Sequence, residues 1–209
     1  MNREMKFTVV TDLSRRDVLK VAVAGLLTGA AAPLFFHPAT ASAAVTGAGG
    51  AKALIVYYSR SGNTREIAKQ IHQAVGGDIV EIQTVDPYPD DYRETTIKAK
   101  QELESGYKPP LTTKIPSLAT YDFVFLGSPN WWGTIATPVM TFLSENDLSG
   151  KTIAPFMTHG GSALGRGPAD IGRLCPKSNI LDGLAVLGKD AKTAQGEVMA
   201  WLRKLGMKG

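Results

Sequence analysis

A phosphate-binding turn is predicted where the first strongly apolar run of the globular part gives way to a helix. The run Ala53–Tyr58 is followed by a short polar loop and then by a helical pattern over Thr64–Val75. Backbone N–H groups at the start of a helix lack intrahelical acceptors, and the helix dipole favours an anion there. The residues of this first loop are Ser59, Arg60, Ser61, Gly62, Asn63 and Thr64. Taken alone, the loop fits either a phosphate site or an ordinary helix-capping turn.

The composition of the first loop excludes several other phosphate chemistries. It lacks the Gly-x4-Gly-Lys-Ser/Thr pattern of nucleoside triphosphatases. It contains no cysteine, so the chemistry of tyrosine phosphatases is absent. The glycines at 47–50 precede the strand instead of following it, unlike those of dinucleotide-binding folds. Arg60 has two open interpretations, contact with the phosphate or exposure to solvent.

Two adjacent tryptophans mark a second loop, Ser128–Thr134, after the apolar run Tyr121–Gly127. The candidate ligand-binding residues here are Pro129, Asn130, Trp131, Trp132 and Gly133. A planar aromatic ligand can stack on such rings. The alternatives are core packing or a partner surface, and we expect at least one of the two rings to be buried. The acidic phospho-acceptor that a response-regulator receiver domain carries at the end of this strand is absent, because the residues there are Gly127 and Ser128.

A third loop, Thr158–Gly165, follows the apolar run Thr152–Met157. Its candidate residues are Thr158, His159, Gly160 and Gly161. Adjacent glycines let backbone N–H and C=O groups approach a ligand closely, and such groups can tune a cofactor. The imidazole of His159 is expected either to cap the turn, the interpretation we favour, or to act as a donor or positive charge at the site.

Strands and helices alternate along the chain, and this alternation places the three loops. Strands are predicted at Ala53–Tyr58, Asp78–Val85, Tyr121–Gly127, Thr152–Met157 and Ile180–Leu187. Helices are predicted at Thr64–Val75, from the Asp91 cap to Ser105, from a Thr137 cap with Pro138 at N1 to Leu143, and at Pro168–Leu174 and Thr193–Leu205. Pro155 is unfavourable inside a central strand. The pattern predicts an α/β fold with a doubly wound parallel sheet, whose ligand-binding loops follow strands one, three and four.

The composition argues against a disulfide-linked fold, a metal centre and a nucleic-acid partner. The chain has 209 residues, of which 44% are hydrophobic, and Cys175 is its only cysteine. No internal disulfide or thiolate metal cluster is therefore possible, and Cys175 is interpreted as a packing residue. From Lys52 onward, 18 Lys and Arg stand against 16 Asp and Glu, with no basic run. This near-neutral charge argues against a nucleic-acid partner. Only two histidines, His72 and His159, follow residue 52, and so few candidate ligands argue against metal catalysis.

The N-terminal segment has the features of an export signal. Arg15 and Arg16 lie in a Ser-Arg-Arg-Asp-Val-Leu-Lys motif that resembles the twin-arginine consensus, with Val18 in place of the usual Phe. A weakly apolar run and small-residue cleavage signals follow, with expected processing after Ala41 or Ala43. We therefore expect an export signal at 1–43, a tether at 44–51 and one domain at 52–209. The alternatives are an ordinary secretory signal and an uncleaved anchor. No stable membrane span is expected after processing.

The motifs Tyr-Ser-Arg-Ser-Gly-Asn-Thr, Ser-Pro-Asn-Trp-Trp-Gly-Thr and Thr-His-Gly-Gly-Ser-Ala-Leu-Gly-Arg, in this order, resemble those of the flavodoxin superfamily. The likeness covers Lys52 to Leu205 and is strongest to a flavodoxin-like branch with a Trp-Trp-Gly loop. It implies a flavodoxin-like three-layer α/β/α sandwich whose five-stranded parallel sheet has the order 2-1-3-4-5, with FMN at the switch point. By this resemblance, the first loop holds the FMN phosphate, while Pro129–Gly133 and Thr158–Gly161 flank the flavin ring.

The resemblance leaves two functions open. One is an electron carrier outside the cytoplasm that works with a redox partner protein or a membrane electron donor. The other is an FMN-dependent oxidoreductase that reduces a small acceptor such as a quinone. Electron-carrier flavodoxins are typically strongly acidic, and their acidic surface steers them to basic partners. The chain from Lys52 is near neutral, so the same kind of partner cannot be assumed here. The segment Asp86–Ser117, with Tyr88 and Tyr92, either borders the flavin or, as we favour, forms a surface helix and loop.

Overall fold

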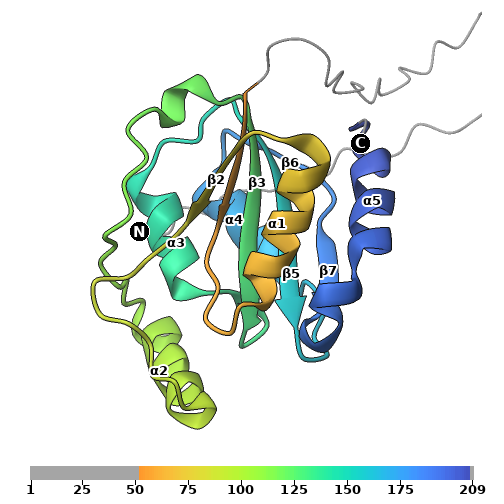
Figure 1. Ribbon diagram of the computed structural model, residues 1–209. Coiled ribbons are helices and arrows are strands. Elements are labelled where there is room, and N and C mark those ends of the chain that lie inside the picture. The colour runs from red at the N-terminus through yellow and green to blue at the C-terminus, as the bar shows by residue number, and fades with distance from the viewer. Residues whose placement is uncertain (1–51, 208–209) are drawn as a thin grey trace, which may run out of the picture. The chain divides into compact units, whose positions relative to one another are not determined.

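The computed structural model describes residues 52–207, so the predicted export signal and tether lie outside the described residues. The described chain alternates strands and helices as expected (Figure 1). Its strands are β1 (Ala53–Tyr57), β2 (Asp78–Glu81), β3 (Phe123–Trp131), β4 (Thr134–Ile135), β5 (Thr152–His159), β6 (Asn179–Ile180) and β7 (Leu184–Leu187). Its α-helices are α1 (Asn63–Val75), α2 (Tyr92–Ser105), α3 (Thr137–Glu145), α4 (Gly167–Leu174) and α5 (Gln195–Lys204), with short 3-10 helices at Leu118–Thr120 and Gly188–Thr193.

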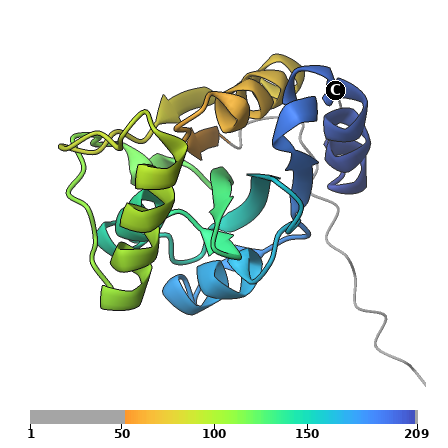
Figure 2. The same cartoon turned by 90° about the horizontal axis from the view of Figure 1, so that it is seen from below.

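The main sheet is parallel, with the order β2-β1-β3-β5 followed by β6 and β7. This order confirms the predicted doubly wound arrangement. Alternate residues of the central strands point to opposite faces. Ile55 and Phe125 pack under α1 and α5, while Val56 and Leu126 pack under α3 and α4. Viewed from below, the helices cover both sides of the strands as the outer layers of a sandwich (Figure 2).

The fifth predicted strand is divided in two, and Pro155 explains where. β5 pairs with β6 through Thr152 and Ile153, and with β7 from Phe156 onward. Pro155 lies between these two ladders, opposite the break in the outer strand. Because proline has no N–H to donate, the break removes the conflict that a continuous ladder would create. The prediction of one strand over Ile180–Leu187 was therefore wrong.

Other element boundaries also differ from the sequence prediction. β2 ends at Glu81 rather than Val85, and Thr84 makes only an isolated antiparallel bridge with Leu111. Helix α3 begins at Thr137 with Ala136 as its N-cap, so Thr137 is the first helical residue and not the cap. Its hydroxyl donates instead to the buried Glu102 carboxylate, at 2.5 Å. The predicted ends of α2 are confirmed, since Asp91 Oδ1 accepts from Glu94 N and Gly106 adopts a left-handed conformation.

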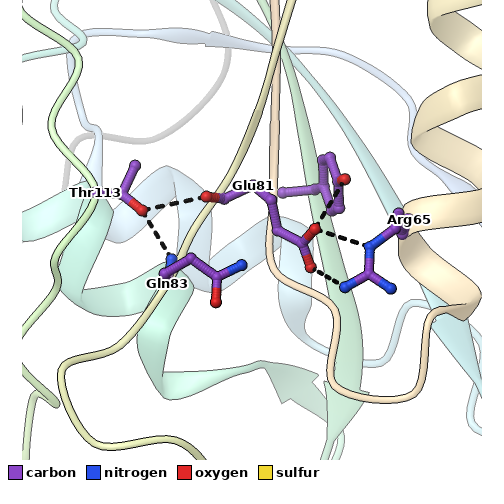
Figure 3. Close-up of polar contacts among 5 residues, drawn as sticks. Arg65, Glu81, Gln83 and Thr113 are labelled. Carbon is purple, nitrogen blue, oxygen red and sulfur yellow. Dashed lines mark hydrogen bonds and ion pairs between the residues drawn. The ribbon is translucent and has the colours of Figure 1, made fainter.

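The segment that carries Thr113 covers the outer edge of β2 (Figure 3). Thr113 Oγ1 donates to Glu81 O and accepts from Gln83 N. Facing the sheet, the Glu81 carboxylate binds Arg65 through two hydrogen bonds of 2.8 and 2.6 Å, and it also accepts from Tyr57. These contacts satisfy polar groups that an edge strand would otherwise expose. They also fix the first turn of α1, which carries Arg65, against β2.

None of the helices between residues 52 and 207 is long and apolar enough to span a membrane. Within the same range, no three His, Cys, Asp or Glu side chains are placed to hold a metal ion. Cys175 is buried in the core beside α3 and α4, and burial raises the pKa of its thiol.

Candidate functional site

The first loop connects β1 to α1 at the carboxyl end of the sheet, which faces the viewer in Figure 2. Gly62 is the N-cap of α1, and no side chain in the described part of the molecule caps this helix. Among the described residues, the backbone N–H groups from Ser59 to Arg65 have no hydrogen-bond acceptor. The capping-turn alternative therefore does not describe this loop, since Ser61 and Asn63 leave the helix terminus open. Free N–H groups at a helix N-terminus are suited to an anion.

Ser59 gives this loop its most informative feature. Its side chain is only 7% exposed, and its hydroxyl has no hydrogen-bond partner in the described part of the chain. Buried polar groups in native proteins are nearly always paired. By contrast, the neighbouring hydroxyl of Thr64 is satisfied, because it lies 2.8 Å from Thr158 Oγ1 at the end of β5. This contact joins the first loop to the third.

The side chain of Arg60 contacts residues outside the first loop. Its guanidinium donates to the carbonyl oxygens of Pro89 and Asp90, at 3.3 and 3.0 Å, and lies over the ring of Tyr92. It thereby links the first loop to the N-terminal end of α2, which extends below the carboxyl end of the sheet in Figure 1. Arg65 is likewise engaged by Glu81. Burial and the negative charge of Glu81 raise the pKa of Tyr57, next to this pair, to about 12.

Most of the predicted second loop is strand. β3 continues to Trp131 and pairs with β4, so Ser128–Trp131 are strand residues and the turn contains only Trp132 and Gly133. The sequence prediction ended this strand too early. The extension is supported by β5, which pairs with β3 as far as Pro129. Inside it, the Ser128 hydroxyl accepts from Ala136 N and ties the two arms of the hairpin together.

The two tryptophans have different environments, but neither is fully buried as expected for one of them: Trp131 is partly buried against the core and Trp132 is exposed. Trp131 packs edge-on against the rings of Tyr88 and Tyr58, with centroid separations of 4.8 and 5.6 Å. Trp132 is 52% exposed, and its Nε1 donates to Thr96 O on α2 at 3.0 Å. Trp132 and Gly133 both have positive φ, 54° and 82°. A two-residue turn with this geometry normally prefers Asn-Gly, so a tryptophan here is conformationally strained.

The second and third loops are joined by several hydrogen bonds. Asn130 donates from Nδ2 to Ala163 O at 2.8 Å and accepts from Gly133 N at 3.0 Å. Arg166 N donates to Gly133 O at 2.8 Å. Gly165, with φ of 54°, lies so close to Gly133 O that a Cβ atom would come nearer than 3.0 Å, a separation essentially never observed. The second and third loops therefore form one connected structure.

In the third loop, β5 extends through His159, two residues beyond the predicted end. The ring of His159 accepts from Gly161 N at 3.0 Å, through Nδ1. This contact confirms the turn-capping interpretation of the histidine. Gly160 and Gly161 follow at the open carboxyl end of β5, and a Cβ atom added at either would meet no atom within 4 Å among the described residues.

Sequence reasoning missed two buried carboxylates that support these loops. Glu102 on α2 is 5% exposed, and its Oε2 accepts from Tyr88 OH and Thr137 Oγ1, each at 2.5 Å. Asp170 on α4 is 4% exposed and accepts from Thr134 on β4. In the sequence, both resemble solvent-facing helix charges, so no local signal distinguishes them. Tyr88, which lies between Glu102 and Trp131, belonged to a segment that we favoured as surface structure.

Open loops at the carboxyl end of a doubly wound sheet are typical of α/β proteins that bind a phosphate-bearing cofactor at this edge. The family model described as flavodoxin matches residues 52–205. The chain belongs to the flavodoxin family, as the sequence motifs suggested.

Solved structures show the same relationship. A candidate flavoprotein from Bacteroides eggerthii superposes with a TM-score of 0.66 at 30% identity, covering 75% of this chain and 99% of its own. A second, from Bacteroides uniformis, gives the same score and identity over 74% of this chain and 99% of its own. A Lactobacillus acidophilus flavoprotein, solved in complex with FMN, has a TM-score of 0.58 and 26% identity, over 68% of this chain and 97% of its own. No curated protein matches the chain.

Proposed function

We propose that this protein binds FMN at the carboxyl end of its sheet and acts in electron transfer. Membership of the flavodoxin family and the likeness to the FMN-bound Lactobacillus flavoprotein support the cofactor. The observation that carries the proposal for this chain is the Ser59 hydroxyl, which is buried beside the open N-terminus of α1 and has no partner within the described range. A phosphate group would accept from this hydroxyl and from the free N–H groups of Ser59–Arg65.

The residues present fit this cofactor. The first loop offers donors and the helix dipole for the phosphate, with Arg60 and Arg65 engaged elsewhere. Trp131 and Trp132, together with the backbone of Thr158–Gly161, are proposed to border the flavin ring. Bound FMN would supply one- or two-electron chemistry, while the protein orients the ring and sets its electrostatic surroundings.

Replacing Ser59 with Ala tests the proposed phosphate site. Because the hydroxyl has no partner among residues 52–207, its loss removes an unpaired buried group, and we expect stability to stay equal or rise by up to about 1 kcal/mol. The FMN dissociation constant should rise about tenfold, the equivalent of about 1.4 kcal/mol. Urea unfolding and titration of FMN fluorescence measure the two effects.

Ser149→Ala provides the matched control, since Ser149 is an exposed serine before the amino end of β5. It should change neither quantity. Destabilised Ser59→Ala protein with unchanged FMN affinity would assign the serine to structure and contradict the site. Failure of the wild-type full chain to bind FMN would refute the proposed function itself.

Replacing Trp132 with Asn separates function from stability at the strained turn. Asn is preferred at this turn position, which offsets the lost contact with Thr96, so the free energy of unfolding should change by less than about 1 kcal/mol. We expect FMN affinity to fall because an aromatic surface is removed. A large loss of stability together with unchanged affinity would show that Trp132 serves the fold instead.

We further propose that the protein works outside the cytoplasm, exported by the twin-arginine route, with a redox partner protein or membrane electron donor. The paired Arg15 and Arg16 motivate this proposal, because twin-arginine transport carries folded, cofactor-loaded proteins. Replacing both with Lys and fractionating cells tests it, and unchanged export would contradict it.

A second candidate function is reduction of a small acceptor such as a quinone. The half-exposed ring of Trp132 at the hairpin tip favours it, since such a surface can receive a planar molecule. With both proteins saturated with FMN, quinone-dependent reoxidation of the chemically reduced protein would support this function if it is saturable and is lost in Trp132→Asn. Reoxidation that is linear in quinone and equal in both proteins would leave only the carrier.

A further inference from the structure

Asp170 is a buried carboxylate on α4, outside all three loops that the sequence identified. It accepts hydrogen bonds from the Thr134 hydroxyl on β4 and from the guanidinium groups of Arg166 and Arg173. The two arginine side chains are 62% and 76% exposed, so the carboxylate alone is buried. Burial by itself raises the pKa of Asp170, but the hydrogen bonds from Thr134, Arg173 and Arg166 outweigh it and leave the pKa below its ordinary value.

Asp170 and Arg166, at the start of α4, contact the β3–β4 hairpin at two points. The Asp170 carboxylate binds Thr134, which directly follows the Trp132-Gly133 turn, while Arg166 N binds the carbonyl of Gly133 within that turn. The hairpin itself has only two residue pairs, Asn130 with Ile135 and Trp131 with Thr134. So short a two-stranded ladder is not stable alone. Its strained turn therefore depends on the contacts with α4 and the third loop.

We propose that Asp170 is a positioning residue that fixes the conformation of the Trp131–Gly133 turn and thereby the surroundings of the bound flavin ring. The inference rests on the proposed FMN-binding function. Asp170 acts through the Thr134 hydroxyl, beside the separate backbone contact of Arg166 N with Gly133 O. A ligand-binding surface must be held within about 0.5 Å by the residues behind it, and Asp170 supplies that support from α4.

Two conservative substitutions test this proposal in the full-length protein, with FMN as the probe. Asp170→Asn keeps the shape but removes the charge that pairs with the arginines. Thr134→Val removes only the hydroxyl on the hairpin side and leaves both ion pairs intact. We expect each to raise the FMN dissociation constant about tenfold, equivalent to roughly 1.4 kcal/mol. Each should also shift the absorption bands and the midpoint potential of bound FMN.

Arg173→Ala is the matched control. Arg173 pairs with the other oxygen of Asp170, and its side chain is mostly exposed. This variant should retain wild-type FMN affinity, absorption bands and potential. Near-ultraviolet circular dichroism of the FMN-free proteins adds an independent readout, because Trp131 and Trp132 should change signal in Asp170→Asn and Thr134→Val but not in Arg173→Ala.

The possible results distinguish the positioning role of Asp170 from the proposed FMN-binding function. If wild type binds FMN and both variants match it in affinity, absorption and potential, Asp170 is only structural, whatever the change in unfolding temperature. If wild type does not bind FMN, the proposed function fails. In that case, altered tryptophan dichroism in the two variants would still support the positioning role for the turn, and unaltered dichroism would overturn it.

Acid should weaken the contribution of Asp170 to stability. Its pKa is lower in the folded protein than in the unfolded chain, so the folded state binds fewer protons and gains stability above the ordinary pKa of about 3.9. We expect the stability difference between wild type and Asp170→Asn to be constant above about pH 5 and to shrink as the pH falls below about 4. Urea unfolding at several pH values measures this, and a difference that grows on acidification would contradict it.

Discussion

Replacing Gly165 with Ala should destabilise the protein by about 2–4 kcal/mol, through a left-handed backbone and an impossible contact. Its φ of 54° is unfavourable for alanine, and the new Cβ would come closer than 3.0 Å to the carbonyl oxygen of Gly133. That oxygen is backbone and accepts from Arg166 N, so it cannot move without displacing the Trp132-Gly133 turn. FMN affinity should fall with stability.

Gly172→Ala is the same chemical change a short distance along the chain, inside α4. Apart from its chain neighbours and the backbone of its own helix, no described atom lies within 4 Å of its Cβ position, and its backbone is not left-handed. Helical glycines are destabilising relative to alanine, so this variant should gain about 0.5–1 kcal/mol and bind FMN normally. Urea unfolding of the two variants should therefore give changes of opposite sign. Equal effects would show that the contact between the second and third loops does not control the turn.

Glu102→Ala should cost about 2 kcal/mol or more, because Tyr88 and Thr137 lose their shared buried acceptor and keep only the contact between their own hydroxyls, at 2.9 Å. Tyr88 and Thr137 both donate to its Oε2, and Tyr88 packs directly against Trp131. The loss should loosen Tyr88 and weaken FMN binding from the side of α2. Glu102→Gln retains an oxygen acceptor, and it should recover most of the stability if hydrogen bonding rather than charge is what matters.

Glu104→Ala is the control on the same helix. Its side chain is 67% exposed, with one ion pair to Lys100 at 3.7 Å. Exposed pairs of this kind contribute little, so the change should stay within about 0.5 kcal/mol. Both substitutions alter helix propensity equally, and their difference isolates the buried network. Similar thermal denaturation midpoints for Glu102→Ala and Glu104→Ala would contradict this role.

The two predictions concern opposite sides of one hairpin. Glu102 on α2 supports Trp131 through Tyr88, and the α4 side supports Gly133 and Thr134 through Gly165, Arg166 and Asp170. If the proposed function holds, FMN affinity depends on residues that lie outside the loops recognisable in the sequence. Double substitution of Glu102 and Asp170 would show whether the two supports act independently, since distant sites add and coupled ones do not.

The sequence by itself determined the features that depend on neighbouring residues. The alternation of strands and helices, the Asp91 cap and Gly106 end of α2, and the open turn between β1 and α1 follow from short-range patterns, and the structure has them. The turn-capping role of His159 also follows from a short-range pattern, because its partner Gly161 is two residues away.

Tertiary structure decided whatever depends on which distant segments meet. β3 extends to Trp131 because β4 and β5 lie beside it, and the outer strand breaks because Pro155 on β5 faces it. Glu102 and Asp170 look like surface charges in the sequence and are buried only because hydroxyls from α3 and β4 reach them. The physical reason is that hydrogen-bond partners and burial are set by three-dimensional neighbours, whereas caps and periodicity are set by the chain itself.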